Sequence, residues 1–153
     1  VASRMTLLVP FDGAALSTIA LRRATEFATF RDEALVVLTV VPDDPEYARE
    51  RGWLDPEDTF DVGVIERKLR QRVRDLAPDA EFRCELIENV EPVASETTDV
   101  ARRIREIAAE VDASVVFVGS ENAGRVTNPL SSVGSPVADT PQYDVYIARR
   151  REE

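Results

Sequence analysis

Residues 115–135 read VVFVGSENAGRVTNPLSSVGS, and this segment decides the fold class. Four β-favouring residues, 115–118, run directly into a loop rich in glycine and serine. This order is typical of a buried parallel strand that ends at an anion-binding corner. At such a corner, bare backbone N–H groups and the dipole of a following helix approach a phosphate. The segment therefore predicts an α/β fold with a candidate phosphate site after this strand.

Strand-like and helix-like stretches alternate along the rest of the chain. Short apolar runs predict strands, and apolar residues spaced three or four positions apart predict helices. The expected strands are 6–11, 34–41, 81–88, 115–118 and 143–148, and the expected helices are 16–30, 65–76 and 97–111. The alternation predicts right-handed crossovers and a mainly parallel sheet with helices on both faces. Ligands of such sheets bind beyond the carboxyl ends of the strands, where Asp12, Val40 and Gly119 fall.

The segment 42–59 is acidic and irregular, and its only large apolar side chains are Tyr47, Trp53 and Leu54. It is long for a connection without secondary structure, which leaves room for a lid or a short docked helix. The favoured reading is a surface excursion that tucks Trp53 into a crevice. Strand 81–88 alternates polar and apolar residues, so we expect it near a sheet edge, with Cys84 as a small core residue.

Length and composition predict one globular domain at 5–149 in a chain of 153 residues. Residues 1–4 are either an upstream extension or a remnant of cloning, and 150–153 form a charged tail. With a single cysteine, no disulfide forms within the chain. No apolar run reaches the length a bilayer needs and no secretory signal is visible, so we expect a cytoplasmic protein without membrane contact.

Charge and residue usage narrow the function classes. Twenty-nine acidic residues oppose 19 basic ones, and the net charge of −10 disfavours binding to nucleic acid. The same acidity, with Lys68 as the single lysine, favours a protein adapted to high salt. The chain has no histidine, which removes the commonest general base. It also lacks a Walker lysine and a dinucleotide fingerprint, so we expect no enzyme.

The order of elements, the residues VPFDG at 9–13 and the residues VGS at 118–120 together resemble the universal stress protein family. The resemblance covers essentially the whole domain. It implies a five-stranded, Rossmann-like parallel sheet of strand order 3-2-1-4-5 and a role in the stress response. It also implies a homodimer formed through the last strand, 143–148. The acidic composition is similar to that of haloarchaeal members of the family.

The resemblance implies two functional branches, one that binds ATP or AMP with Mg²⁺ and one that binds no nucleotide. In the ATP-binding branch, the positions that match Asp12 and Val40 hold the adenine, and a glycine-rich loop holds the phosphates. The candidate nucleotide-binding residues are Asp12, Val40, Gly119, Asn122, Gly124, Ser131 and Ser132.

The family's phosphate loop has the pattern Gly, two residues, Gly, nine residues, Gly-Ser/Thr, and the chain fits it in two registers. One register keeps Gly124 and Gly134 but leaves a short final helix. The favoured register places Asn122 and Ser131 where the second and third glycines are expected, and Ser132 begins the helix. In this register the motif is degraded but recognisable.

Each of these residues also has a purely structural interpretation. Asp12 either contacts the nucleotide or caps the first helix, a role that aspartate favours. The loop glycines either cradle phosphate or let the chain turn, and the serines either donate to phosphate or cap a helix. The two hypotheses for the protein are a nucleotide-binding stress-response module and a dimeric interaction module without nucleotide. Trp53 or the segment 42–59 lying in the crevice would favour the second.

Overall fold

The computed structural model describes residues 5–88, 93–122 and 143–149, with the backbone alone for 93–98 and 122. In chain order its elements are β1 (Thr6–Pro10), α1 (Ala15–Arg31), β2 (Ala34–Pro42), α2 (Pro45–Glu50), α3 (Val62–Leu76), β3 (Glu81–Ile87), α4 (Val93–Glu110), β4 (Ala113–Gly119), a 3₁₀ turn (Ser120–Asn122) and β5 (Asp144–Ala148). All the predicted strands and helices are present. β4, α3 and α4 begin two, three and four residues earlier than expected, and α2 is an additional short helix.

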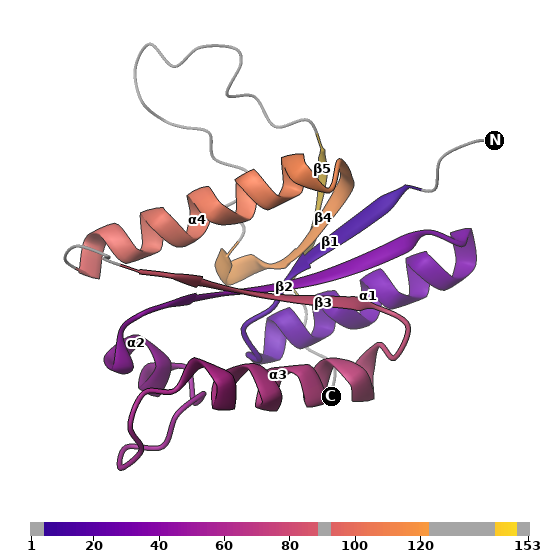
Figure 1. Ribbon diagram of the computed structural model, residues 1–153. Helices are drawn as coiled ribbons and strands as arrows, with labels where there is room; N and C mark the ends of the chain where they lie inside the picture. Colours follow the sequence, from indigo (N-terminus) through magenta and orange to yellow (C-terminus); the bar gives the residue numbers. More distant parts are fainter. Residues whose placement is uncertain (1–4, 89–92, 123–142, 150–153) are drawn as a thin grey trace, which may run out of the picture.

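The strands form one five-stranded sheet in the order β3-β2-β1-β4-β5, and every neighbouring pair is parallel. This confirms the predicted fold class and strand order. α1 and α3 cover one face of the sheet and α4 covers the other (Figure 1). The order reverses direction between β1 and β4, because the chain leaves β3 at one edge and returns beside β1. A parallel sheet opens a crevice for ligands at this reversal.

The central strands are apolar because both of their faces are covered. Leu7, Leu8 and Val9 of β1 are almost fully buried, as is most of β2. Phe117 of β4 is fully buried and packs edge-on against Phe27 of α1, with ring centroids 5.3 Å apart. Apolar burial on two faces is the main stabilising term of such a sheet, and it holds the strand ends in place for a site.

The segment 42–59 combines the two structures considered for it. Asp44 accepts a hydrogen bond from Glu46 N–H, and Pro45 follows at the first helical position, so a six-residue helix, α2, begins there. Beyond α2 the chain turns, and Trp53 lies buried with 5% of its surface exposed. The segment therefore contains a short docked helix and also tucks Trp53 into the molecule.

The edge strand β3 is half-exposed along its length, as its alternating pattern predicts. Cys84 is half-buried here rather than in the core, and burial raises the pKa of its thiol to about 11. Arg103 of α4 donates to Glu85 of β3, with Nη2 and Oε1 2.6 Å apart, and also contacts Glu106 and Glu110. The Arg103–Glu85 ion pair joins α4 to the edge strand β3.

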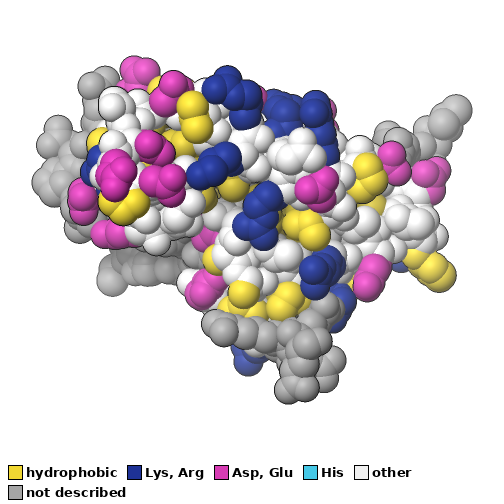
Figure 2. All heavy atoms as spheres, turned by 90° about the horizontal axis from the view of Figure 1, so that it is seen from below, with side chains coloured by type: hydrophobic (Ala, Val, Ile, Leu, Met, Phe, Trp, Pro, Cys, Tyr) yellow, Lys and Arg dark blue, Asp and Glu magenta, His cyan; other side chains and the backbone are white. Residues whose placement is uncertain are grey.

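Charge is distributed unevenly over the surface. Figure 2 shows basic side chains across the middle of the α3 side and acidic side chains gathered at one end. α3 itself carries Arg67, Lys68, Arg70, Arg72 and Arg74 against Glu66 and Asp75. The acidic surplus of the chain therefore lies outside this helix. Among the helices of the described ranges, none combines the length and apolar character that a membrane crossing requires.

Candidate functional site

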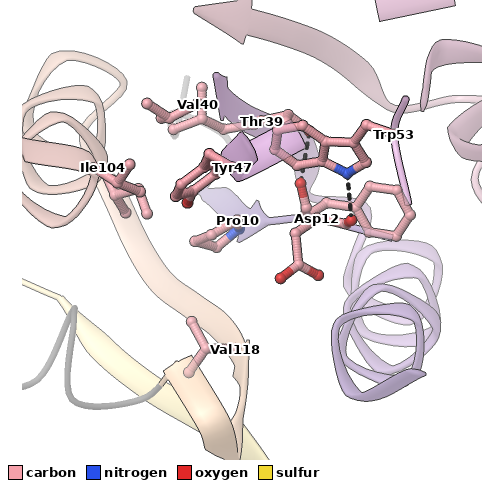
Figure 3. Close-up of a pocket in the computed structure, with 11 residues that line it drawn as sticks. Pro10, Asp12, Thr39, Val40, Tyr47, Trp53, Ile104 and Val118 are labelled. Atoms are coloured by element: carbon pink, nitrogen blue, oxygen red, sulfur yellow. Dashed lines mark hydrogen bonds between the residues drawn. The ribbon is translucent and has the colours of Figure 1, made fainter. Parts of the chain in front are cut away.

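A pocket lies at the carboxyl ends of β1, β2 and β4, where the strand order reverses (Figure 3). It encloses about 420 Å³, part of which is open to solvent. Its lining residues are Pro10, Phe11, Asp12, Leu38, Thr39, Val40, Tyr47, Trp53, Val100, Ile104 and Val118. Two of the predicted site residues, Asp12 and Val40, thus meet in one pocket.

Among the described residues, the two carboxylate oxygens of Asp12 differ, because hydrogen bonds reach Oδ1 but not Oδ2. Its Oδ1 accepts hydrogen bonds from Ala14 N–H at 2.9 Å and from the Ser17 hydroxyl at 2.8 Å. The N-cap residue of α1 is Ala14, and no side chain caps this helix, so the predicted capping role of Asp12 is wrong. Asp12 instead braces the turn that leads into α1. Within the described ranges, no hydrogen bond reaches its second oxygen, Oδ2. Among the described residues, that oxygen is therefore available to a ligand.

Three successive backbone carbonyls after β1, at residues 11–13, are each held by a side chain from elsewhere. Thr39 Oγ1 donates to the first at 2.6 Å, Trp53 Nε1 to the second at 2.8 Å and Arg72 Nη1 to the third at 2.9 Å. We call these three side chains the carbonyl clamp. Gly13 has a φ of 85°, which glycine adopts readily, so the chain turns sharply here. The clamp fixes this turn from β2, the α2–α3 connection and α3.

The backbone of Val40 presents an unused hydrogen-bonding edge to the pocket. Phe11 N–H donates to Leu38 C=O at 2.8 Å, whereas Asp43 N–H donates to Ile87 C=O of β3 at 2.9 Å. Because alternate residues of a strand point their backbone groups to the same side, Val40 faces the β1 side, as Leu38 does. β1 has already ended at that level. Outside the sheet's own ladders, no backbone hydrogen bond between described residues involves the N–H or C=O of Val40. The register of β2 therefore leaves a donor and an acceptor side by side, facing the pocket.

Tyr47 and Trp53 supply an aromatic part of the pocket wall. Both are buried, and their ring centroids are 5.9 Å apart. The Arg51 guanidinium lies 3.4 Å from the centre of the Tyr47 ring. In Figure 3, Tyr47 lies near Val40, Ile104 and Pro10, which also line the pocket. The segment 42–59 therefore lies along the crevice, which favours the hypothesis of a module without nucleotide.

Gly119 ends β4 beside the pocket and has a packing role of its own. A Cβ at this position would lie 2.7 Å from the Cβ of Leu16 and 3.1 Å from its carbonyl carbon, so the strand end touches the first turn of α1. The backbone of Asn122 lies in the 3₁₀ turn that follows. The other three predicted loop residues, Gly124, Ser131 and Ser132, lie outside the described residues.

Several pocket residues were not predicted as site residues. Tyr47 was noted only as an apolar group, and Val100 and Ile104 lie in the helix expected at 97–111. Two signals in the sequence could have found part of this wall. Thr39 is the one polar residue in the apolar run 34–41, and Asp44-Pro45 is a typical helix start. Across the described part of the chain, no three His, Cys, Asp or Glu side chains gather as a metal site.

Comparison with known proteins identifies the architecture. The model of the universal stress protein family matches residues 4–149. A crystal structure of a universal stress protein in complex with cAMP is 27% identical over 97% of this chain and 98% of that one, with a TM-score of 0.53. The dAMP complex of the universal stress protein from Archaeoglobus fulgidus is 19% identical, covers 97% and 99% of the two chains and has a TM-score of 0.53. UspA from Lactobacillus plantarum is 17% identical over 97% and 100%, with a TM-score of 0.54. A search of curated proteins finds no match.

Proposed function

Because the chain belongs to the universal stress protein family, we propose that it is a non-catalytic regulatory module whose pocket binds an adenine nucleotide, ATP or AMP. The relative that is 27% identical is a complex with cAMP, which is an adenine nucleotide. The pocket of this chain combines apolar walls with few polar groups, the usual composition of a small-ligand site.

The observation that carries the proposal is the unused backbone edge of Val40. Its N–H and C=O face the pocket beyond the end of β1. Adenine presents an acceptor ring nitrogen beside an amino donor, which is the complementary pattern. The faces of the base would pack between Pro10 on one side and Ile104 and Val118 on the other. Asp12 Oδ2 would accept from a ribose hydroxyl in a charge-assisted hydrogen bond.

The phosphate end of the site is a prediction from the family resemblance. It assigns the phosphates, with Mg²⁺, to Gly119, Asn122, Gly124, Ser131 and Ser132. The packing of Gly119 against Leu16 offers an independent reason for glycine at 119, so that residue alone does not argue for a phosphate.

Isothermal titration with ATP and Mg²⁺ in molar KCl tests the proposal, with GTP as the matched control. We expect saturable binding of ATP below millimolar concentration and binding of GTP weaker by about tenfold or more. Guanine reverses the donor and acceptor on the edge that would face Val40, which leaves polar groups unpaired. Absence of saturable ATP binding up to the millimolar range, about −4 kcal/mol, would contradict the proposal.

A second candidate function is an interaction module that binds no nucleotide, and the position of Tyr47 favours it. If the Tyr47 ring occupies the place of the base, the wild-type protein binds no ATP and Tyr47→Ala opens the pocket. ATP binding by Tyr47→Ala alone would support this second function. Equal binding by both proteins would exclude a blocking role for Tyr47.

We also propose that the protein forms a homodimer through β5. This strand is a sheet edge, and edges with free backbone groups are commonly paired. The Tyr146 ring of β5 stacks on the Phe117 ring of β4, with ring centroids 5.1 Å apart. This contact helps to hold β5 against the sheet. Light scattering in high salt tests the proposal, and a monomer at working concentration would contradict it.

The net charge of −10 supports adaptation to a salt-rich medium, with self-repulsion screened by ions. We expect the melting temperature to rise from low to molar KCl. A flat or falling melting temperature would argue against this adaptation.

A further inference from the structure

The indole of Trp53 holds the residue that carries the free carboxylate oxygen in the pocket. Its Nε1 donates to the backbone carbonyl of Asp12 at 2.8 Å, across 41 positions of sequence. On the opposite side, the carboxylate of Asp12 is held by Ala14 N–H and the Ser17 hydroxyl. Figure 3 shows the indole on one side of Asp12 and the carboxylate pointing away from it, toward the side of Val118. Asp12 is thus bonded through both its backbone and its side chain.

Trp53 is itself fixed, so it can position another residue. It is 5% exposed, its backbone N–H donates to Ala48 C=O of α2 at 3.0 Å, and Lys68 Nζ lies 3.4 Å from its carbonyl oxygen. In the carbonyl clamp it is the only member that bonds to Asp12 itself. Arg72 is exposed and bonds to the next residue, Gly13.

We propose that Trp53 is a positioning residue that aims the Asp12 carboxylate at a sugar hydroxyl of the bound nucleotide. The inference rests on the proposed nucleotide function and adds to it the chemical class of the ligand. Trp53 makes the site select nucleotides that carry ribose hydroxyls over those that lack them. The orientation of the Asp12 carboxylate matters because the strength of a hydrogen bond falls steeply as its angle departs from linear. The contacts of the base with Val40 and the apolar walls do not pass through Trp53 Nε1.

The test compares ATP with 2′,3′-dideoxy-ATP, which keeps the base and phosphates but has no sugar hydroxyl. In the wild-type protein we expect ATP to bind about tenfold or more tightly than the dideoxy nucleotide, as for a hydrogen bond to a charged group. Trp53→Phe keeps an aromatic ring and removes the N–H donor. This variant should bind dideoxy-ATP within about twofold of wild type and lose most of the preference for ATP.

Two further variants separate positioning from general damage. Tyr146→Phe keeps an aromatic ring and removes a polar atom at a position in β5 that does not line the pocket, so its preference for ATP should stay at the wild-type value. In an Asp12→Asn background, Trp53→Phe should cause no further change in the preference, because the group that Trp53 positions has lost its charge. Equal losses of ATP and dideoxy-ATP in Trp53→Phe would show that Trp53 only shapes the pocket, and would overturn the inference.

The wild-type protein offers a readout that needs no variant. The chain has one tryptophan, so its indole N–H gives a single resonance in a ¹⁵N-correlated NMR spectrum. That resonance should shift on adding ATP and shift clearly less with dideoxy-ATP. If the wild type binds both nucleotides equally, the inference is wrong while the base pocket stands. If it binds neither, the proposed nucleotide function fails as well.

Discussion

The crevice has two walls that are held in different ways. The β1–β2 wall comprises the strand ends at 10–12 and 38–40 with Tyr47 and Trp53, and side-chain hydrogen bonds to backbone carbonyls hold it. The β4–α4 wall comprises Val118, Val100 and Ile104, and apolar packing holds it. Since an individual hydrogen bond contributes less net stability than a buried aliphatic side chain, the walls should respond differently to substitution.

The difference separates recognition from stability at the level of chemical groups. The β1–β2 wall carries the polar groups of Asp12 and Val40, which can select a ligand. The β4–α4 wall offers a ligand only apolar surface. The buried apolar side chains of both walls belong to one core. Substitution of an apolar side chain should therefore lower stability in either wall, whereas substitution of a polar group should mainly change ligand selection.

The largest expected effect is in the β4–α4 wall. Ile104→Ala removes a side chain that is 6% exposed, and the free energy of unfolding should fall by about 3 kcal/mol through lost burial and a residual cavity. Chemical denaturation measures the change. Ile87→Ala at the half-exposed β3 edge is the control and should cost clearly less. Equal costs would mean that the β4–α4 wall is not part of the core.

The next effect concerns the close approach of β4 to α1. Gly119→Ala places a Cβ 2.7 Å from Leu16 Cβ and close to its backbone, so we expect a loss of about 2 kcal/mol in unfolding free energy. Gly52→Ala is the control, since nothing lies within 4 Å of its added Cβ and only its φ of 75° is unfavourable. The control should lose about 1 kcal/mol. A tolerated Gly119→Ala would show that α1 shifts freely against the strand end.

A smaller stability effect, with a larger binding effect, is expected at Asp12. Asp12→Ala removes the acceptor for Ala14 N–H and the Ser17 hydroxyl and should cost about 1 kcal/mol of stability. Asp12→Asn keeps an acceptor oxygen and should cost only a few tenths. Both variants should lose the preference for ribose nucleotides, measured by titration. If a stable Asp12 variant kept the preference for ribose nucleotides, Asp12 would not be a contact of the sugar.

The smallest effect is expected at the exposed end of the carbonyl clamp. Arg72→Gln weakens the bond to Gly13 C=O in an exposed position, so unfolding free energy should change by no more than about 0.5 kcal/mol. Thermal melting in parallel with wild type measures it. A loss above about 2 kcal/mol would mean that the turn after β1 depends on Arg72, and that a side-chain hydrogen bond of the carbonyl clamp can contribute to folding as much as apolar packing does.

The sequence predicted the sheet and helices because their signals are local. Apolar runs marked β2 and β4, and regular apolar spacing marked α3 and α4. β4, α3 and α4 begin earlier than predicted for a simple reason: residues before the apolar pattern can extend a helix or strand without changing its buried face. The helix α2 was left open because six residues carry too little periodicity, although Asp44-Pro45 marks its start.

The candidate site was predicted in part. Asp12 and Val40 were placed by their positions at strand ends, and the structure brings both into one pocket. The aromatic wall could not be predicted as such, because Tyr47 and Trp53 reach the pocket by a path that depends on how α2 docks. The purely structural role of Gly119 also depends on a contact with Leu16, which is about a hundred residues away in sequence.

The sequence by itself determined the element order, the parallel sheet and the residues that stand at its carboxyl edge, because local apolar periodicity and strand alternation dictate them. Only the tertiary structure decided how those residues are used. It paired one oxygen of Asp12 with the start of α1 and left the other without a partner among the described residues. It also ended β1 before Val40, so that a backbone edge of Val40 faces the pocket. It also brought Trp53 to the carbonyl of Asp12. These outcomes depend on where separate elements meet in space, which no local pattern records.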